Sequence, residues 1–298
     1  MANARVGALL GLSAAVMWAL YLTYVRRAAV TGLGPSDIIA LRYGVGAVVM
    51  VPWLIAQGGL RDLAGVGWRR GAALAVFAGP AFPWLAATGF QYAPLAHGAV
   101  IQPSAAVIVA TLIALFALRE RAGREQVVGL GLVLLGIGLI GFSNASAEGA
   151  WRGQLLFAGA GAMWAAFTVL LRVWSVSGLA ATAAVNVISA LVFLPLYAVF
   201  ADHSAVAALP LLDLAGLALV HGVLAGVLAI AAYGRAVALL GISRAALFPA
   251  IVPAVALFLG IPLVGEWPSA AEWVGAVLAT VGLSVALGAV PGLRRFGL

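Results

Sequence analysis

The 298-residue sequence contains no cysteine, no lysine and few acidic residues. The absence of cysteine excludes disulfides, thiol catalysis, cysteine-ligated zinc and palmitoylation. Only 8% of the residues are charged, whereas a soluble domain carries roughly a quarter. The chain therefore has too few charges to coat a water-soluble fold. The same composition excludes a disordered chain and a nucleic-acid-binding protein, although the formal net charge is +7.

The sequence is instead strongly apolar: 65% of its residues are hydrophobic and the mean hydropathy is +1.15. A helix needs about 20 apolar residues to cross the hydrocarbon of a bilayer. We therefore predict an all-α polytopic membrane protein with ten transmembrane helices and no extramembrane domain. The ten segments lie at about 6–25, 36–56, 70–91, 95–118, 126–142, 153–172, 180–200, 212–234, 244–264 and 270–290.

The arginines are distributed unevenly between the two sides that ten spans define. One side carries both termini and Arg5, Arg61, Arg69, Arg70, Arg119, Arg121, Arg124, Arg172, Arg235, Arg244, Arg294 and Arg295. The other side carries Arg26, Arg27 and Arg152. Because arginine excess marks the cytoplasmic side, we expect both termini in the cytoplasm of a cell whose inner (plasma) membrane holds the protein.

The two halves of the chain repeat at an offset of 146 residues. The matches are uncommon residue types in one register: Met17-Trp18-Ala19 with Met163-Trp164-Ala165, Arg26 with Arg172, Pro103 with Pro249, and Glu120 with Glu266. We predict an internal duplication, with a first five-helix repeat over 1–147 and a second over 148–298. Glycines recur as well (Gly129 with Gly275, Gly136 with Gly282) and predict close packing of the fifth and tenth helices.

An odd number of helices in each repeat has a topological consequence. The second copy must enter the membrane from the opposite side, so the repeats are inverted. Inverted repeats are typical of transporters, whose substrate site lies near the midplane between them. Two half-bundles that rock about a shared centre would expose this site to each side in turn. One chain holds both repeats, so a monomer should suffice.

The second part of each repeat has a distinctive order of features. A small-residue helix has a central proline (Pro103, Pro249), a glutamate follows at its end (Glu120, Glu266), and a glycine-rich helix comes next. This order resembles the EamA-type domain of the drug/metabolite transporter superfamily, present twice. The Leu41-Arg42-Tyr43 stretch resembles the arginine–aromatic pair of that family.

The resemblance covers nearly the whole chain and implies a fold and an activity. The implied fold has ten helices and a central cavity lined by spans one, three, four, six, eight and nine. Ten-span members with both termini inside export amino acids and other metabolites, and some carry nucleotide sugars or sugar phosphates. Amino-acid exporters, including the aromatic amino-acid exporter, are the closest in size.

Ten residues are candidates for substrate binding because they bring aromatic, amide or ionisable groups into the spans. They are Trp18, Tyr21, Arg42, Trp84, Tyr92, His97, Gln102, Trp164, Phe167 and His221. Alternatives stay open: packing for the tryptophans, an interfacial belt for Tyr92, carbonyl bonding for the histidines, and snorkelling to the surface for Arg42. Pro103 and Pro249 predict kinks that either act as hinges or shape the cavity.

The charged groups that the spans lack narrow the class of possible substrates. No Asp or Glu lies deep in a span, which argues against an exporter of lipophilic cations. Only Arg42 is clearly within a span, which disfavours sugar-phosphate carriers because they need clustered cations. Small neutral or zwitterionic solutes such as amino acids fit best; nucleosides, sugar phosphates and drugs are alternatives, and a non-transporting scaffold is a remote one. No enzyme motif, cofactor or metal site is indicated.

Overall fold

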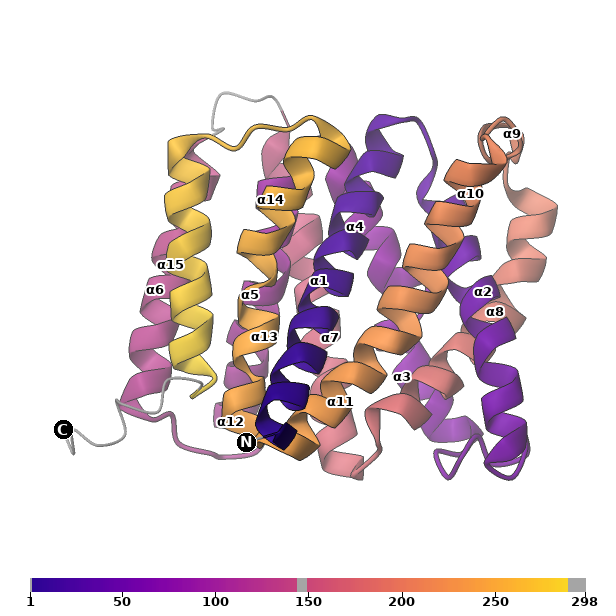
Figure 1. Ribbon diagram of the computed structural model, residues 1–298, viewed down its shortest axis with the longest axis horizontal. Coiled ribbons are helices and arrows are strands. Elements are labelled where there is room, and N and C mark those ends of the chain that lie inside the picture. The colour runs from indigo at the N-terminus through magenta and orange to yellow at the C-terminus, as the bar shows by residue number, and fades with distance from the viewer. Residues whose placement is uncertain (1, 144–148, 289–298) are drawn as a thin grey trace.

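The structure is a computed structural model that describes residues 2–143 and 149–288, and these residues form helices and connections without a strand (Figure 1). Eight helical stretches in this part of the chain are long and apolar enough to cross a membrane, judged by length and composition. They are Asn3–Val30, Pro35–Ala56, Trp68–Tyr92, Leu95–Phe116, Arg124–Ser143, Ala150–Trp174, Gly178–Phe200 and Leu211–Leu240. Two apolar helices are shorter, Val252–Val264 and Ala270–Ala286. The predicted polytopic all-α class is therefore confirmed.

The helices follow one another in two series. The first half holds α1 (Ala2–Val30), α2 (Pro35–Ala56), α3 (Trp68–Ala78), α4 (Ala81–Tyr92), α5 (Leu95–Phe116) and α6 (Arg124–Ser143). The second half holds α7 (Ala150–Trp174), α8 (Gly178–Phe200), α9 (Ser204–Ala207), α10 (Leu211–Ala218), the π-helix η1 (Leu219–Leu228), α11 (Ala229–Leu240), α12 (Ile242–Ala245), α13 (Leu247–Ala250), α14 (Val252–Val264) and α15 (Ala270–Ala286).

Three of the predicted spans are not simple helices. The third divides into α3 and α4 at Gly79 and Pro80, and the eighth contains the π-helix η1 between α10 and α11. The ninth was predicted as one helix and instead consists of α12, α13 and α14. Pro249 and Pro253 account for this difference because proline has no backbone N–H to continue a helix. Pro103, the repeat equivalent of Pro249, lies inside the continuous helix α5. The span is therefore interrupted at Pro249 but not at Pro103.

The two halves run in opposite directions through the molecule. Helix α1 begins at the lower end of Figure 1, and α7 begins at the upper end. The most extensive helix contacts join one half to the other: α6 with α15, α5 with α7, α1 with α11 and α14, and α2 with α8. The pairs α5–α7 and α14–α1 are equivalent under the repeat. The two halves therefore interleave, and each packs extensively against the other.

Glycines make the contact between α6 and α15 close. A Cβ atom on Gly129 would lie 2.6 Å from the carbonyl oxygen of Gly282, and one on Gly275 would lie 2.9 Å from that of Gly136. No side chain fits at these distances, so the backbones touch through their repeat-equivalent glycines. The predicted close packing of these two helices is confirmed, and it follows the small-residue rule for helix pairs in membranes.

We predict that Gly136→Leu destabilises the protein, whereas Gly138→Leu does not. A Cβ on Gly136 would lie 2.6 Å from the Gly275 carbonyl oxygen, but nothing lies within 4 Å of one on Gly138. Overpacking of this kind costs roughly 1–3 kcal/mol. Thermal unfolding midpoints in one detergent compare the two variants, and equal losses would contradict the assigned packing.

Candidate functional site

A narrow pocket lies between the two halves, about midway along the helices that form it. Its lining comes from α2, α3, α7, α8, η1 and α11: Arg42, Tyr43, Ala78, Trp164, Phe167, Thr182, Val185, Asn186, Gly226 and Ile230. Three of these residues are in the first half and the others are in the second. A pocket at the junction of two repeats is where the transporters that share this architecture place their substrate.

Arg42 brings the largest charge to this pocket, and aromatic rings hold its guanidinium. The guanidinium carbon lies 4.8 Å from the centre of the Tyr21 ring and 5.8 Å from that of Tyr43. The Tyr21 ring also contacts the His221 ring, with ring centres 5.3 Å apart and ring planes at 79°. The stacking contributes cation–π attraction. It orders the cluster Arg42–Tyr21–Tyr43–His221, which we call the arginine cluster.

The break between α3 and α4 fixes the position of Tyr43. Phe82 N–H bonds to the Gly79 carbonyl, which leaves the Ala78 carbonyl without its usual helical donor. The Tyr43 hydroxyl donates to this carbonyl at 2.7 Å. A backbone group freed at depth must find a partner, so the proline-interrupted helix orients a residue of the arginine cluster.

The π-helix η1 and two glycines bring the second half close to α2. His221 lies in η1, and π-helical turns occur frequently at functional sites. A Cβ on Gly222 would lie within 3.3 Å of the Gly46 backbone nitrogen, and one on Gly46 would collide with the Asn186 side chain. Only glycine allows this approach, which sets His221 against Tyr21.

Several polar atoms of the arginine cluster are buried without a hydrogen-bond partner among the described residues. They are Arg42 Nη1, Tyr21 Oη, and both ring nitrogens of His221. A buried polar group without a partner is unfavourable by roughly 1–3 kcal/mol, and by more if it is charged. The cluster can therefore bind a polar ligand, because such a ligand would satisfy these atoms.

The structure brings five of the predicted candidates together. Arg42, Trp164 and Phe167 line the pocket, and Tyr21 and His221 complete the arginine cluster. Trp164 contacts Phe82 and Phe167 with ring centres 5.3 and 5.1 Å apart.

The other candidates lie elsewhere. Trp18 contacts Tyr233 at 5.4 Å, and Gln102 lies where α5 crosses α7 at Gly161. Trp84 and Tyr92 are 43% and 44% exposed on the helix surface. The substrate-binding roles of these four residues stay predictions.

His97 lies in the first turn of α5 and is fully buried. Its Nδ1 is 3.2 Å from the side-chain nitrogen of Gln154 on α7. Its Nε2 is 3.9 Å from a carboxylate oxygen of Glu272 on α15. His97 thus joins three helices from the two halves, and its role in binding substrate stays a prediction.

Two ion pairs lie at opposite ends of the molecule, and they are equivalent under the repeat. At the upper end Arg26 pairs with Glu266, and at the lower end Arg172 pairs with Glu120 at 2.7 Å. Each pair joins the first helix of one half (α1 or α7) to the segment that follows α14 or α5 in the other half. Sequence reasoning assigned these glutamates to helix ends and missed the pairing, although both members recur at the same offset.

The Arg26–Glu266 pair is less exposed than the Arg172–Glu120 pair and makes additional hydrogen bonds to the backbone. Its side chains are 16% and 24% exposed, against 65% and 42% for Arg172 and Glu120. Arg26 also donates to the Phe90 carbonyl, and Glu266 accepts the Leu95 N–H at 2.8 Å. We call Arg26–Glu266 the upper pair and Arg172–Glu120 the lower pair.

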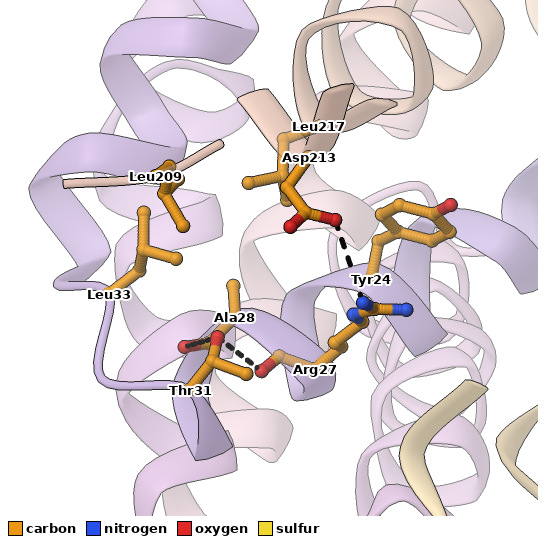
Figure 2. A pocket seen from close by; sticks show the side chains of 8 residues that line it. All are labelled: Tyr24, Arg27, Ala28, Thr31, Leu33, Leu209, Asp213 and Leu217. Atoms are coloured by element: carbon orange, nitrogen blue, oxygen red, sulfur yellow. Dashed lines mark hydrogen bonds and ion pairs between the residues drawn. The ribbon is translucent and has the colours of Figure 1, made fainter. Parts of the chain in front are cut away.

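A second pocket lies beside the end of α1 (Figure 2), and Arg27 and Asp213 face each other there at 3.6 Å. Tyr24 of α1 and Thr31, just after α1, also line this pocket. Consecutive arginines therefore attach α1 to two different segments of the second half. Arg26 pairs with Glu266 in the segment after α14, and Arg27 pairs with Asp213 of α10.

These observations define a polytopic helical membrane protein built from two related halves with a pocket between them. The sequence pattern of the EamA-like transporter family matches residues 5–142 and again residues 151–288. The chain belongs to the EamA-like transporter family, and it is a membrane transporter of the drug/metabolite type.

Comparison with other proteins supports the fold. A solved structure described as "Crystal structure of protein" covers 97% of this chain and 99% of its own, with 19% identity and a TM-score of 0.64. At this identity the likeness shows the fold alone. No curated protein matches the chain.

We predict that Glu266→Gln lowers stability more than Glu120→Gln does. The first change leaves the Arg26 guanidinium partly buried without its counter-charge, which costs about 1–3 kcal/mol, whereas an exposed pair contributes about 0–1 kcal/mol. Thermal midpoints in detergent at one scan rate make the comparison. A larger loss for Glu120→Gln would contradict the difference between the two pairs.

Proposed function

We propose that this transporter moves amino acids or similar small neutral or zwitterionic metabolites across the inner (plasma) membrane by alternating access, as an exporter. The observation that carries the proposal is the pocket between the halves. It lies at mid-depth and combines one cation, Arg42, with an aromatic wall of Trp164 and Phe167. A carboxylate and an apolar side chain of one solute would both find a complement there.

The composition of the pocket supports an amino acid over a cationic drug. None of its lining residues is acidic, so a lipophilic cation would meet Arg42 with no counter-charge. The rings of Phe82, Trp164 and Phe167 form a continuous chain of contacts. Such a wall favours large apolar or aromatic side chains, which stack on rings and lose water on binding.

The two ion pairs supply a means of alternating access. Each pair ties the halves together at one end only, and the pairs are chemically equivalent. We infer that the upper pair closes the upper entrance, that the lower pair closes the lower entrance, and that one pair opens when the halves shift. Both pairs are formed in this structure. The upper pair is less exposed and has additional hydrogen bonds to the backbone, so we infer that the upper end is the more firmly closed.

The arginine distribution orients this state in the membrane. Arg61 follows α2, Arg69 and Arg70 lie in the first turn of α3, and Arg119 follows α5. These helix ends lie at the lower end of Figure 1, where α1 begins. By the positive-inside rule the lower end is cytoplasmic, so both termini are cytoplasmic and the upper pair faces outward. One chain contains both halves of the pocket, and we expect a monomer to transport.

We predict saturable counterflow of an amino-acid class by the purified protein in liposomes, and loss of affinity in Trp164→Ala. Removing the aromatic wall should raise the half-saturating concentration roughly tenfold or more. Trp151→Ala, which truncates an exposed tryptophan on the same helix as Trp164, is the matched control. Two pH gradients separate proton coupling from facilitated exchange. Equal counterflow in the two variants would contradict the pocket assignment.

We also predict that Glu266→Gln opens the pocket to the outside. The chain has no cysteine, so a Val185→Cys substitution places the sole thiol in the pocket lining. An impermeant maleimide applied to intact cells should label this thiol on the order of ten times faster when Glu266→Gln is added. Glu120→Gln is the matched control and should not increase outside labelling. Equal acceleration by both changes would contradict the proposed closures.

A further inference from the structure

We propose that Arg42 is the receptor for a carboxylate group of the solute, so that a free carboxylate is the feature the substrates share. This inference rests on the proposed function and makes its substrate class specific. It starts from a guanidinium whose Nη1 is buried and has no hydrogen-bond partner among the described residues. An uncompensated charge at membrane depth is strongly unfavourable, which points to a ligand that supplies the missing anion.

The acidic residues of the described chain do not supply that anion. Asp37, five residues before Arg42 on α2, accepts the Tyr197 hydroxyl at 2.7 Å and the Gly34 N–H at 3.0 Å. Glu120, Asp213 and Glu266 pair with other arginines, and Glu272 lies 3.9 Å from His97. No ion pair among the described residues includes Arg42. Arg42 therefore keeps its charge available to the pocket that it lines.

The surroundings of Arg42 suit a carboxylate better than a single point of negative charge. The Tyr21 ring lies against the guanidinium and the Tyr43 side chain is hydrogen-bonded to it, which leaves Nη1 as the unused donor group. A guanidinium presents parallel N–H groups, which match the two oxygens of a carboxylate. The unpartnered Tyr21 hydroxyl lies in the same cluster and can donate a further hydrogen bond. Snorkelling to the surface does not fit a buried Nη1.

The arginine cluster also breaks the repeat, unlike the ion pairs. The positions equivalent to Arg42, Tyr43 and His221 are Ile188, Ser189 and Ala75. A group needed for the scaffold or for closing both ends would be expected in both halves, as Arg26 and Arg172 are. A group that meets one end of an asymmetric solute is needed only once.

The first test uses the unaltered protein in liposomes with phenylalanine, phenylalaninamide, phenethylamine and phenylpyruvate as competing solutes, together with the leucine series. We expect the two carboxylates of each series to compete in counterflow and to raise the thermal midpoint in detergent. The amide and the amine should do neither. Competition by amide or amine as strong as by the acid would overturn the carboxylate assignment, and it would leave the transport proposal standing.

The second test alters the receptor. Arg42→Gln should raise the half-saturating concentration of the carboxylate on the order of 10- to 100-fold. Arg42→Lys should raise it by less, because lysine keeps the positive charge but not the two parallel N–H groups of the guanidinium. Arg235→Gln, which removes an exposed arginine on α11, is the matched control. Carboxylate affinity unchanged in a folded Arg42→Gln protein would overturn the assignment.

The two proposals fail in different ways. If no carboxylate is exchanged and none shifts the midpoint, Arg42 is not a carboxylate receptor. Exchange of nucleosides or amines in that case would preserve alternating access with another substrate. If no solute of any class is exchanged by protein that unfolds cooperatively, the proposed function itself fails.

Discussion

The structure depends first on the requirement that every backbone N–H and C=O in hydrocarbon be hydrogen-bonded. Long helices satisfy it almost everywhere, which is why each half is a series of helices. The exceptions are informative because they occur next to the pocket. The break after α3 frees the Ala78 carbonyl, and Tyr43 bonds to it; the π-helix η1 carries His221. The irregular backbone thus positions the polar groups that a regular bundle would leave among apolar side chains.

Duplication separates the charges of this protein into two sets. Arg26, Arg172, Glu120 and Glu266 obey the repeat and join the halves at opposite ends. Arg42 and His221 do not obey it and lie between the ends, one in the pocket lining and one behind it. In the proposed mechanism, the first set serves a motion that is the same in both directions. The second set would meet a solute whose two ends differ, so a symmetric scaffold would carry asymmetric chemistry.

Much of this arrangement could be predicted from the sequence, and the rest could not for physical reasons. The lengths of the apolar segments located the helices, and the recurrence of Gly136 and Gly282 predicted close packing of the helices that carry them. An offset identifies equivalent residues but not which helices meet, so the contacts between the halves and the Arg26–Glu266 pair could not be predicted. Helices here are apolar on all faces, so periodicity could not separate pocket-lining Trp164 from surface Trp84.

If Arg42 holds a carboxylate, the empty and loaded pockets differ in how readily they close. Closing both ends excludes water from the guanidinium, which is unfavourable when no anion is present and much less so when one is bound. A ligand shifts a conformational equilibrium only by its different affinity for the two states, and here that difference arises from one neutralised charge. The loaded pocket would pass through the closed state more easily than the empty one. Arg42 would thereby favour exchange of solutes over a return of the empty transporter, although the ion pairs at the two ends work equally in both directions.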